Sequence, residues 1–123
     1  MLKIGKDNEI VLTQGNSAEI DITPLDEDGK PHELQEGDKV IFVVKSHRKE
    51  VLRKELTLHD WDNEQNALIL ILQPEDTINL PAIGYEYDFL YVFADGSKYT
   101  FIDKTSFVLV QAISKVGEAN EQA

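Results

Sequence analysis

Hydrophobic residues recur at every second position through most of this chain, and no segment repeats them at the spacing of a long amphipathic helix. In the stretch 17–23, Ala18, Ile20 and Ile22 alternate with polar residues, a pattern typical of a strand with one buried and one solvated face. Five aromatic residues share the same spacing in 85–93. Because successive side chains of a strand point to opposite faces, this period of two predicts an all-β fold.

Turn-forming residues divide the alternating pattern into strand-length pieces, as at Asp28-Gly29 and Asp95-Gly96. The expected strands are 17–23, 39–45, 50–58, 67–73, 85–93, 98–103 and 106–113. The more polar segment 50–58 could also form a short helix, and we favour a strand because its neighbours are strands. The spacing of the expected strands predicts a single all-β domain of about eight strands, with two sheets joined by Greek-key crossings. Pro74 should begin an irregular crossover with one helical turn. We expect residues 1–116 to form one domain and residues 117–123 to form a flexible tail.

Length and composition exclude several classes of protein. The 123 residues suit one domain, and the net charge of −11 argues against nucleic-acid binding, which needs a basic surface. The absence of cysteine rules out thiol catalysis, cysteine-based zinc sites and disulfides. The longest apolar run, 67–72, is too short to cross a bilayer, and the first ten residues lack the apolar segment of a signal peptide. We therefore expect neither nucleic-acid binding nor membrane insertion.

The charges are distributed unevenly along the chain. Residues 39–54 carry six lysines or arginines against Glu50 alone, whereas acidic residues dominate before and after. One interpretation is a hairpin whose outward positions are basic; the other is a surface that docks on an acidic face of a neighbouring copy. The candidate partner contacts are Lys45, Arg48, Lys49, Arg53, Lys54 and Trp61.

Aromatic residues allow a structural and a binding interpretation. Trp61, in the expected loop 59–66, either stacks on a sugar or partner or folds back over the core. The aromatic face of 85–93 either lines a carbohydrate cleft or supplies the sandwich core, and we favour the core. Tyr85 is expected to form a tyrosine corner, with its hydroxyl bonded to the preceding crossover and Gly84 allowing a close approach.

Motifs that carry chemistry are missing from the sequence. The three histidines lie on separate segments without metal-ligand spacing, and the serines lack a nucleophile-elbow context. Asp60 could begin an EF-hand calcium loop, but Gln65 and Ile71 stand where that loop requires Gly and Glu. A weak surface calcium site in the loop 59–66 or in the turn 26–29 is the alternative to solvated turn carboxylates. We otherwise expect no catalytic residue, no cofactor and no metal, and therefore not an enzyme.

The order of the turn and corner residues resembles the immunoglobulin-like N-terminal domain of phage baseplate upper proteins and of related small prophage tail-associated proteins. The similarity covers residues 9–113. The residues that carry it are Gly15, Asn16, Ser17, Asp28, Gly29, Gly37, Asp38, Pro74, Asp76, Thr77, Gly84, Tyr85, Tyr87, Asp88, Asp95, Gly96, Thr100 and Phe107.

This resemblance implies that the fold is an immunoglobulin-like Greek-key β-sandwich of about 7–9 antiparallel strands. It implies a structural protein of a phage or prophage tail or baseplate, and it implies no catalytic residue. Its partners would be other phage structural proteins or further copies of itself. It would be made in the bacterial cytoplasm and then incorporated into the virion. The alternative is a carbohydrate- or ligand-binding sandwich module in which Trp61 and tyrosines at the ends of the aromatic strand form the platform.

Overall fold

The computed structural model of the chain describes residues 2–112, so the predicted tail 117–123 and residues 113–116 of the predicted domain lie outside it. The strands are β1 Leu2–Ile4, β2 Ile10–Thr13, β3 Ala18–Ile22, β4 Lys39–Ser46, β5 Lys49–Leu56, β6 Trp61–Asp62, β7 Ala67–Leu72, β8 Gly84–Val92 and β9 Lys98–Val110. The helical turns are η1 Lys6–Asn8, η2 Leu58–Asp60 and α1 Pro74–Thr77. The helical turn predicted after Pro74 is therefore confirmed.

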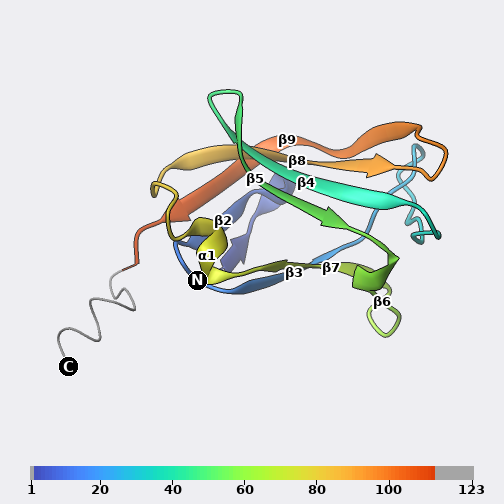
Figure 1. Cartoon of the computed structure of the whole chain (residues 1–123), viewed down its shortest axis with the longest axis horizontal. Coiled ribbons are helices and arrows are strands. Elements are labelled where there is room, and N and C mark those ends of the chain that lie inside the picture. The colour runs from blue at the N-terminus through green and yellow to red at the C-terminus, as the bar shows by residue number, and fades with distance from the viewer. Residues whose placement is uncertain (1, 113–123) are drawn as a thin grey trace.

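The strands form two sheets that pack face to face, with the larger sheet above the smaller one in Figure 1. The larger sheet has the order β1-β2-β9-β8-β4-β5, and the smaller has the order β3-β7-β6. The all-β prediction is confirmed. The expectation that every pair is antiparallel is wrong at one place, because β2 runs parallel to β9 with Ile10 opposite Phe107. Parallel neighbours need a long connection, and residues 14–97 separate these two strands.

Two further differences concern strand limits. The sequence predicts separate strands over 98–103 and 106–113, but residues 98–110 form the single strand β9. Residue 113 of the second predicted strand lies outside the described residues. The pairing of β9 with β8 shifts register between Tyr87 and Phe89, so a bulge absorbs the polar residues that interrupt the pattern. The antiparallel pair β1–β2 near the N-terminus was not predicted, because three- and four-residue strands carry too few positions to show a period.

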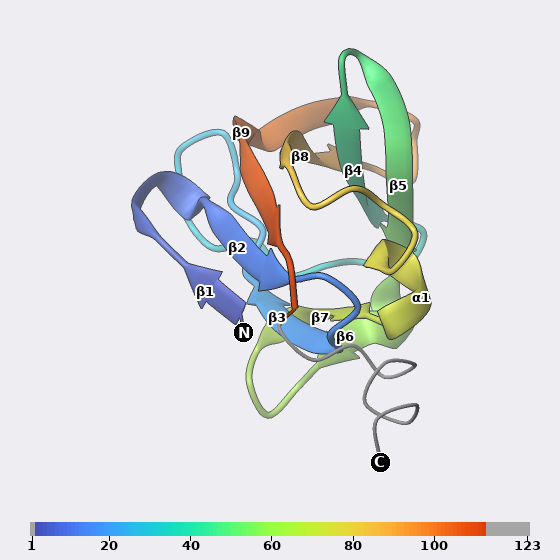
Figure 2. The ribbon, with the colours of Figure 1, turned by 90° about the vertical axis from the view of Figure 1, so that its left-hand side faces the viewer.

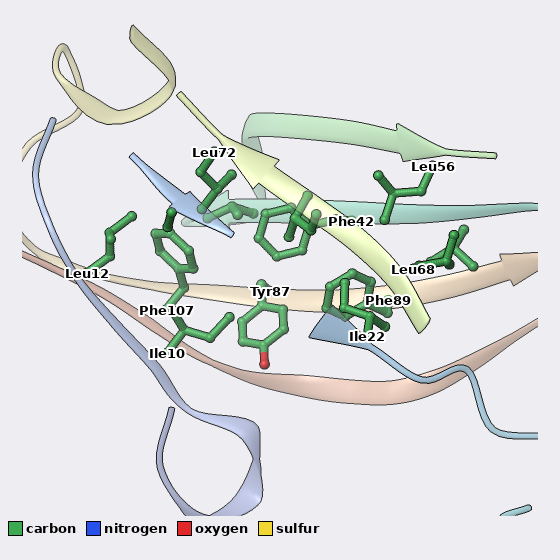
Figure 3. Packing of buried hydrophobic residues seen from close by; sticks show 14 of the residues in the cluster. Ile10, Leu12, Ile22, Phe42, Leu56, Leu68, Leu72, Tyr87, Phe89 and Phe107 are labelled. Carbon is green, nitrogen blue, oxygen red and sulfur yellow. The ribbon is translucent and has the colours of Figure 1, made fainter. Parts of the chain in front are cut away.

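The core lies between the two sheets, as Figure 3 shows. Phe42 of β4 is fully buried, and its ring centroid lies 5.0 Å from that of Phe89 and 5.5 Å from that of Tyr87. Leu68 and Leu70 of β7 complete the apolar contact from the smaller sheet. The aromatic residues of β8 are thus buried in this cluster, which confirms the core interpretation of that strand face.

The tyrosines also connect the core to the loops around it. All four tyrosines of the chain donate their hydroxyl protons to groups outside the β8 and β9 strands. The pairs are Tyr85 to Pro81 O, Tyr87 to Asn8 O, Tyr91 to Asp38 Oδ2 and Tyr99 to Leu25 O. Burial raises the pKa of Tyr87 to about 12, and burial together with Asp38 raises the pKa of Tyr91 well above its usual range. The rings of Tyr85, Tyr87 and Tyr91 are therefore part of the core and the ring of Tyr99 packs against it, while each hydroxyl is bonded to a loop or turn.

Gly37 occupies a backbone position that a side chain would disturb in two ways. Its φ is +87°, and a Cβ atom would lie 2.8 Å from Cβ of Ala94. We expect Gly37→Ala to lower the free energy of unfolding by about 2–4 kcal/mol, from left-handed backbone strain plus overpacking. Gly29→Ala is the matched control, because Gly29 has φ +78° and a Cβ atom there would meet no other atom within 4 Å. Its loss should be about 1–2 kcal/mol, from the backbone alone. Urea unfolding of both variants tests this, and equal losses would contradict the steric contribution.

Candidate functional site

The β4–β5 hairpin ends in a two-residue turn that projects from the larger sheet, at the top of Figures 1 and 2. Ser46 pairs with Lys49, and the turn residues His47 and Arg48 have φ values of 52° and 69°. Turns of this kind favour Asn-Gly, because both central residues need positive φ. Histidine and arginine at these positions place backbone strain at the tip of the hairpin.

Three of the candidate contact residues gather at this tip. Lys45, Arg48 and Lys49 are exposed, and no ion pair with a side chain that the structure describes involves them. With His47, which is also exposed, they form the surface that we name the basic tip. The three cations, which have no counter-ion among the described side chains, give this projection a positive potential.

The other two basic candidates lie elsewhere and already have partners. Arg53 forms ion pairs with Glu50 at 3.1 Å and Glu55 at 3.6 Å on the exposed surface of β5. Lys54 points toward α1, where its Nζ lies 2.8 Å from Oδ2 of Asp76. Its side chain is only 28% exposed, so Lys54 ties the edge strand β5 to the crossover. The structure thus separates Arg53 and Lys54 from the basic tip.

A shallow hollow of about 580 Å³ lies beside the basic tip. Lys45 and Arg48 line one side, and Glu86 and Asp88 of β8 line the other. Glu86 is paired with Lys104 at 3.1 Å. The hollow therefore contains charges of both signs and opens to solvent next to the free cations of the tip.

Trp61 does not stand in an open loop. It begins the short strand β6, pairs with Leu68 of β7, and its half-buried side chain packs against the core. Its Nε1 atom is buried without a hydrogen-bond partner. This arrangement matches the interpretation of a tryptophan covering the end of the core, and it leaves little of the ring to stack on a sugar.

The geometry supports the predicted tyrosine corner for Tyr85 but not the role expected of Gly84. The Tyr85 hydroxyl donates to Pro81 O at 2.7 Å, which is the bond to the crossover expected of a tyrosine corner. Burial raises the pKa of this hydroxyl. Gly84, however, has open space around its Cβ position, so no close approach requires a glycine there.

We expect Tyr85→Phe to lower the free energy of unfolding by about 1 kcal/mol, the usual net contribution of one such hydrogen bond. The ring stays in place, so only the bond to Pro81 O is lost. Thermal and urea unfolding measure the effect. Gly84→Ala serves as the comparison and should change stability by less than about 0.5 kcal/mol; a larger loss for Gly84→Ala than for Tyr85→Phe would contradict this assignment.

Residues that carry the family resemblance also make contacts that close the two ends of the sandwich. At one end, Gly15 N donates to Oγ1 of the fully buried Thr77 at 2.8 Å. At the other, Oδ1 of the buried Asp38 accepts from Ala94 N at 2.9 Å, and its Oδ2 accepts from the Tyr91 hydroxyl. These short motifs are therefore structural clamps between loops distant in sequence.

A second surface was not anticipated from the sequence. On the outer side of the smaller sheet, Ile69 and Ile71 of β7 lie opposite Asp21 and Glu19 of β3, respectively. Ile71 is 46% exposed. We name this surface the acidic isoleucine face, and it comprises Glu19, Asp21, Asp62, Glu64, Ile69 and Ile71. The signal was present in the run 67–72, whose apolar residues occupy both faces of a strand that has only one face toward the core.

The described residues contain no group of three or more histidines, aspartates or glutamates placed to hold a metal ion. No helix in residues 2–112 is long and apolar enough to cross a membrane. Neither the loop 59–66 nor the turn 26–29 gathers such a ligand group, and Asp62 Oδ1 instead accepts from Glu64 N at 2.9 Å. Comparison with known proteins gave no match to any family model, curated protein or solved structure.

Proposed function

We propose that this chain is a non-enzymatic structural domain of a phage or prophage tail or baseplate, acting through protein–protein contacts. The observation that carries the proposal is the basic tip. Its turn holds His47 and Arg48 in a conformation that favours Asn-Gly, and its cations are exposed and unpaired within the described residues. Strain at an exposed, charged projection costs stability without a gain inside the fold, which is typical of a contact site.

We further propose that the fold is immunoglobulin-like. In that fold one sheet contains strands C, F and G, extended by C′ in variable-type domains, and the other contains B, E and D. The order β9-β8-β4-β5 fits G-F-C-C′, and the order β3-β7-β6 fits B-E-D. The clamps made by Gly15, Thr77 and Asp38 add support, because they give the turn residues of the resembling family a physical role in this sandwich.

The alternative of a carbohydrate-binding module has weaker support. The tyrosines of β8 are at most 4% exposed, and Trp61 is half-buried against the core. These residues therefore offer no open stacking platform of the kind that binds sugars. A glycan array with the wild type and Trp61→Ala, checked for folding, would revive this alternative only if binding is present and depends on Trp61.

Co-purification with proteins encoded beside this chain tests the proposed function. We expect a tail or baseplate protein to bind the wild type and to be lost from the variant Lys45→Glu/Arg48→Asp/Lys49→Glu. Aspartate is chosen at position 48 because it tolerates positive φ. The matched control is Lys3→Glu/Lys30→Glu/Lys98→Glu, which makes the same change in net charge at exposed lysines outside the tip. Absence of any virion protein among the binding partners and of the chain from virions would overturn the proposal.

A further inference from the structure

The basic tip and the acidic isoleucine face lie on opposite sides of the molecule. Figures 1 and 2 show the β4–β5 turn projecting upward from the larger sheet, while β3, β6 and β7 form the lower layer. The two surfaces therefore cannot contact each other within one copy. Each is nevertheless available, because the tip projects into solvent and Ile71 is 46% exposed.

The two surfaces are complementary in charge. The acidic isoleucine face carries four carboxylates and, within the described residues, no ion pair involves any of them. The basic tip carries two lysines and one arginine that have no counter-ion among the described side chains. Oppositely charged surfaces attract and orient each other during association, especially at low salt.

The acidic isoleucine face also has the shape and chemistry of a receiving surface. Ile69 and Ile71 line two adjacent hollows of about 280 and 670 Å³, one toward β5 and one toward η2 and β6. An apolar centre inside a polar rim is the usual anatomy of a protein interface. Burying Ile71 under the aliphatic parts of lysine and arginine side chains would add apolar contact to the charge pairing.

We propose that copies of this chain associate head to tail, with the basic tip of one copy seated on the acidic isoleucine face of the next. This contact is heterologous, since it joins two different surfaces and leaves one free tip and one free face on each pair. It therefore builds a ring if the rotation between copies closes, and an open row if it does not. The proposal rests on the proposed function only in taking the basic tip as a protein contact.

Sedimentation velocity and light scattering of the full chain over a range of concentrations test the proposal. The wild type should gain mass with concentration at about 50 mM salt, and its association constant should fall about tenfold or more at about 500 mM, where exposed charges are screened. The tip variant Lys45→Glu/Arg48→Asp/Lys49→Glu should stay monomeric. The face variant Glu19→Lys/Asp21→Lys/Glu64→Lys should also stay monomeric. The control variant Lys3→Glu/Lys30→Glu/Lys98→Glu should associate like the wild type.

The decisive measurement is a mixture of the tip and face variants. The reversed tip of one is now complementary to the reversed face of the other, and their unaltered tip and face still match, so association should return in the mixture. Circular dichroism and thermal unfolding of each variant establish that it is folded. A wild type that stays monomeric at low salt, or a mixture that stays monomeric, overturns head-to-tail association.

The two proposals fail separately. A monomeric wild type that binds a tail protein through its tip overturns self-association and keeps the proposed function. If copies associate but bind no virion protein and are absent from virions, the proposed function is overturned and self-association is kept.

Discussion

Replacing Phe42 with alanine should lower the free energy of unfolding by about 3–5 kcal/mol, the range for removing a buried aromatic ring. Phe42 is fully buried at the centre of the cluster in Figure 3, where its ring contacts Tyr87, Phe89 and Phe107. Alanine would leave a cavity between the sheets that these rings, fixed in their own contacts, can fill only in part. Because domains of this size have a total stability of about 5–15 kcal/mol, this single change should remove a large part of the free energy of unfolding.

Urea denaturation of two further variants calibrates this prediction. Phe42→Leu keeps most of the apolar volume and should cost less than about 2 kcal/mol. Leu58→Ala removes a side chain that is 43% exposed and should change stability by no more than about 0.5 kcal/mol. A loss below about 1 kcal/mol for Phe42→Ala would show that the two sheets do not depend on this ring.

Replacing Asp38 with alanine should lower the free energy of unfolding by about 3 kcal/mol. The carboxylate is only 6% exposed and accepts hydrogen bonds from the Tyr91 hydroxyl, from Ala94 N and from Gln35 N at 3.3 Å. Removing it leaves the Tyr91 hydroxyl, on a fully buried residue, without its acceptor, and an unsatisfied buried polar group costs about 1–3 kcal/mol. The replacement also removes the hydrogen bond from Ala94 N, which connects the turn after β8 to the turn before β4.

A double-mutant cycle with Tyr91→Phe tests the cause. Tyr91→Phe alone should cost about 1–2 kcal/mol, because Asp38 keeps its two backbone donors. The double variant should be more stable than the sum of the single losses predicts, since phenylalanine removes the orphaned hydroxyl. Additive losses would mean that Asp38 acts only through the backbone of the two turns.

The sequence predicted what depends on local period and turn chemistry. Alternation identified the long strands and the buried aromatic face of β8, and Pro74 marked the helical turn of the crossover. The split of β9 was predicted wrongly because a bulge lets one strand continue past polar residues, and no local pattern reports a bulge. Pairing partners such as β2 and β9 are set by packing across the whole chain, which periodicity does not describe.

The candidate contact surface was also predictable only in part from the sequence. The sequence located the basic segment, but hairpin geometry decides which of its residues are free. Lys45 and Lys49 come to the exposed tip, whereas Lys54 alternates to the inner side and meets Asp76 from a distant helical turn. The acidic isoleucine face was missed because its residues come from β3, β6 and β7, and only the register between these strands brings the isoleucines beside the carboxylates.

The parallel pairing of β2 with β9 has a consequence for how the chain acquires its structure. Ile10 meets Phe107 only after nearly all of the described chain has been synthesised, so the larger sheet cannot be completed during translation until its last strand emerges. Contacts this distant in sequence make folding slow, and sandwiches of this kind fold on the order of milliseconds to seconds. Until β9 arrives, the edges of β2 and β8 that it later covers are open to pairing with other chains. Pairing of β9 is therefore the step that completes the larger sheet, and chains that end before it should aggregate.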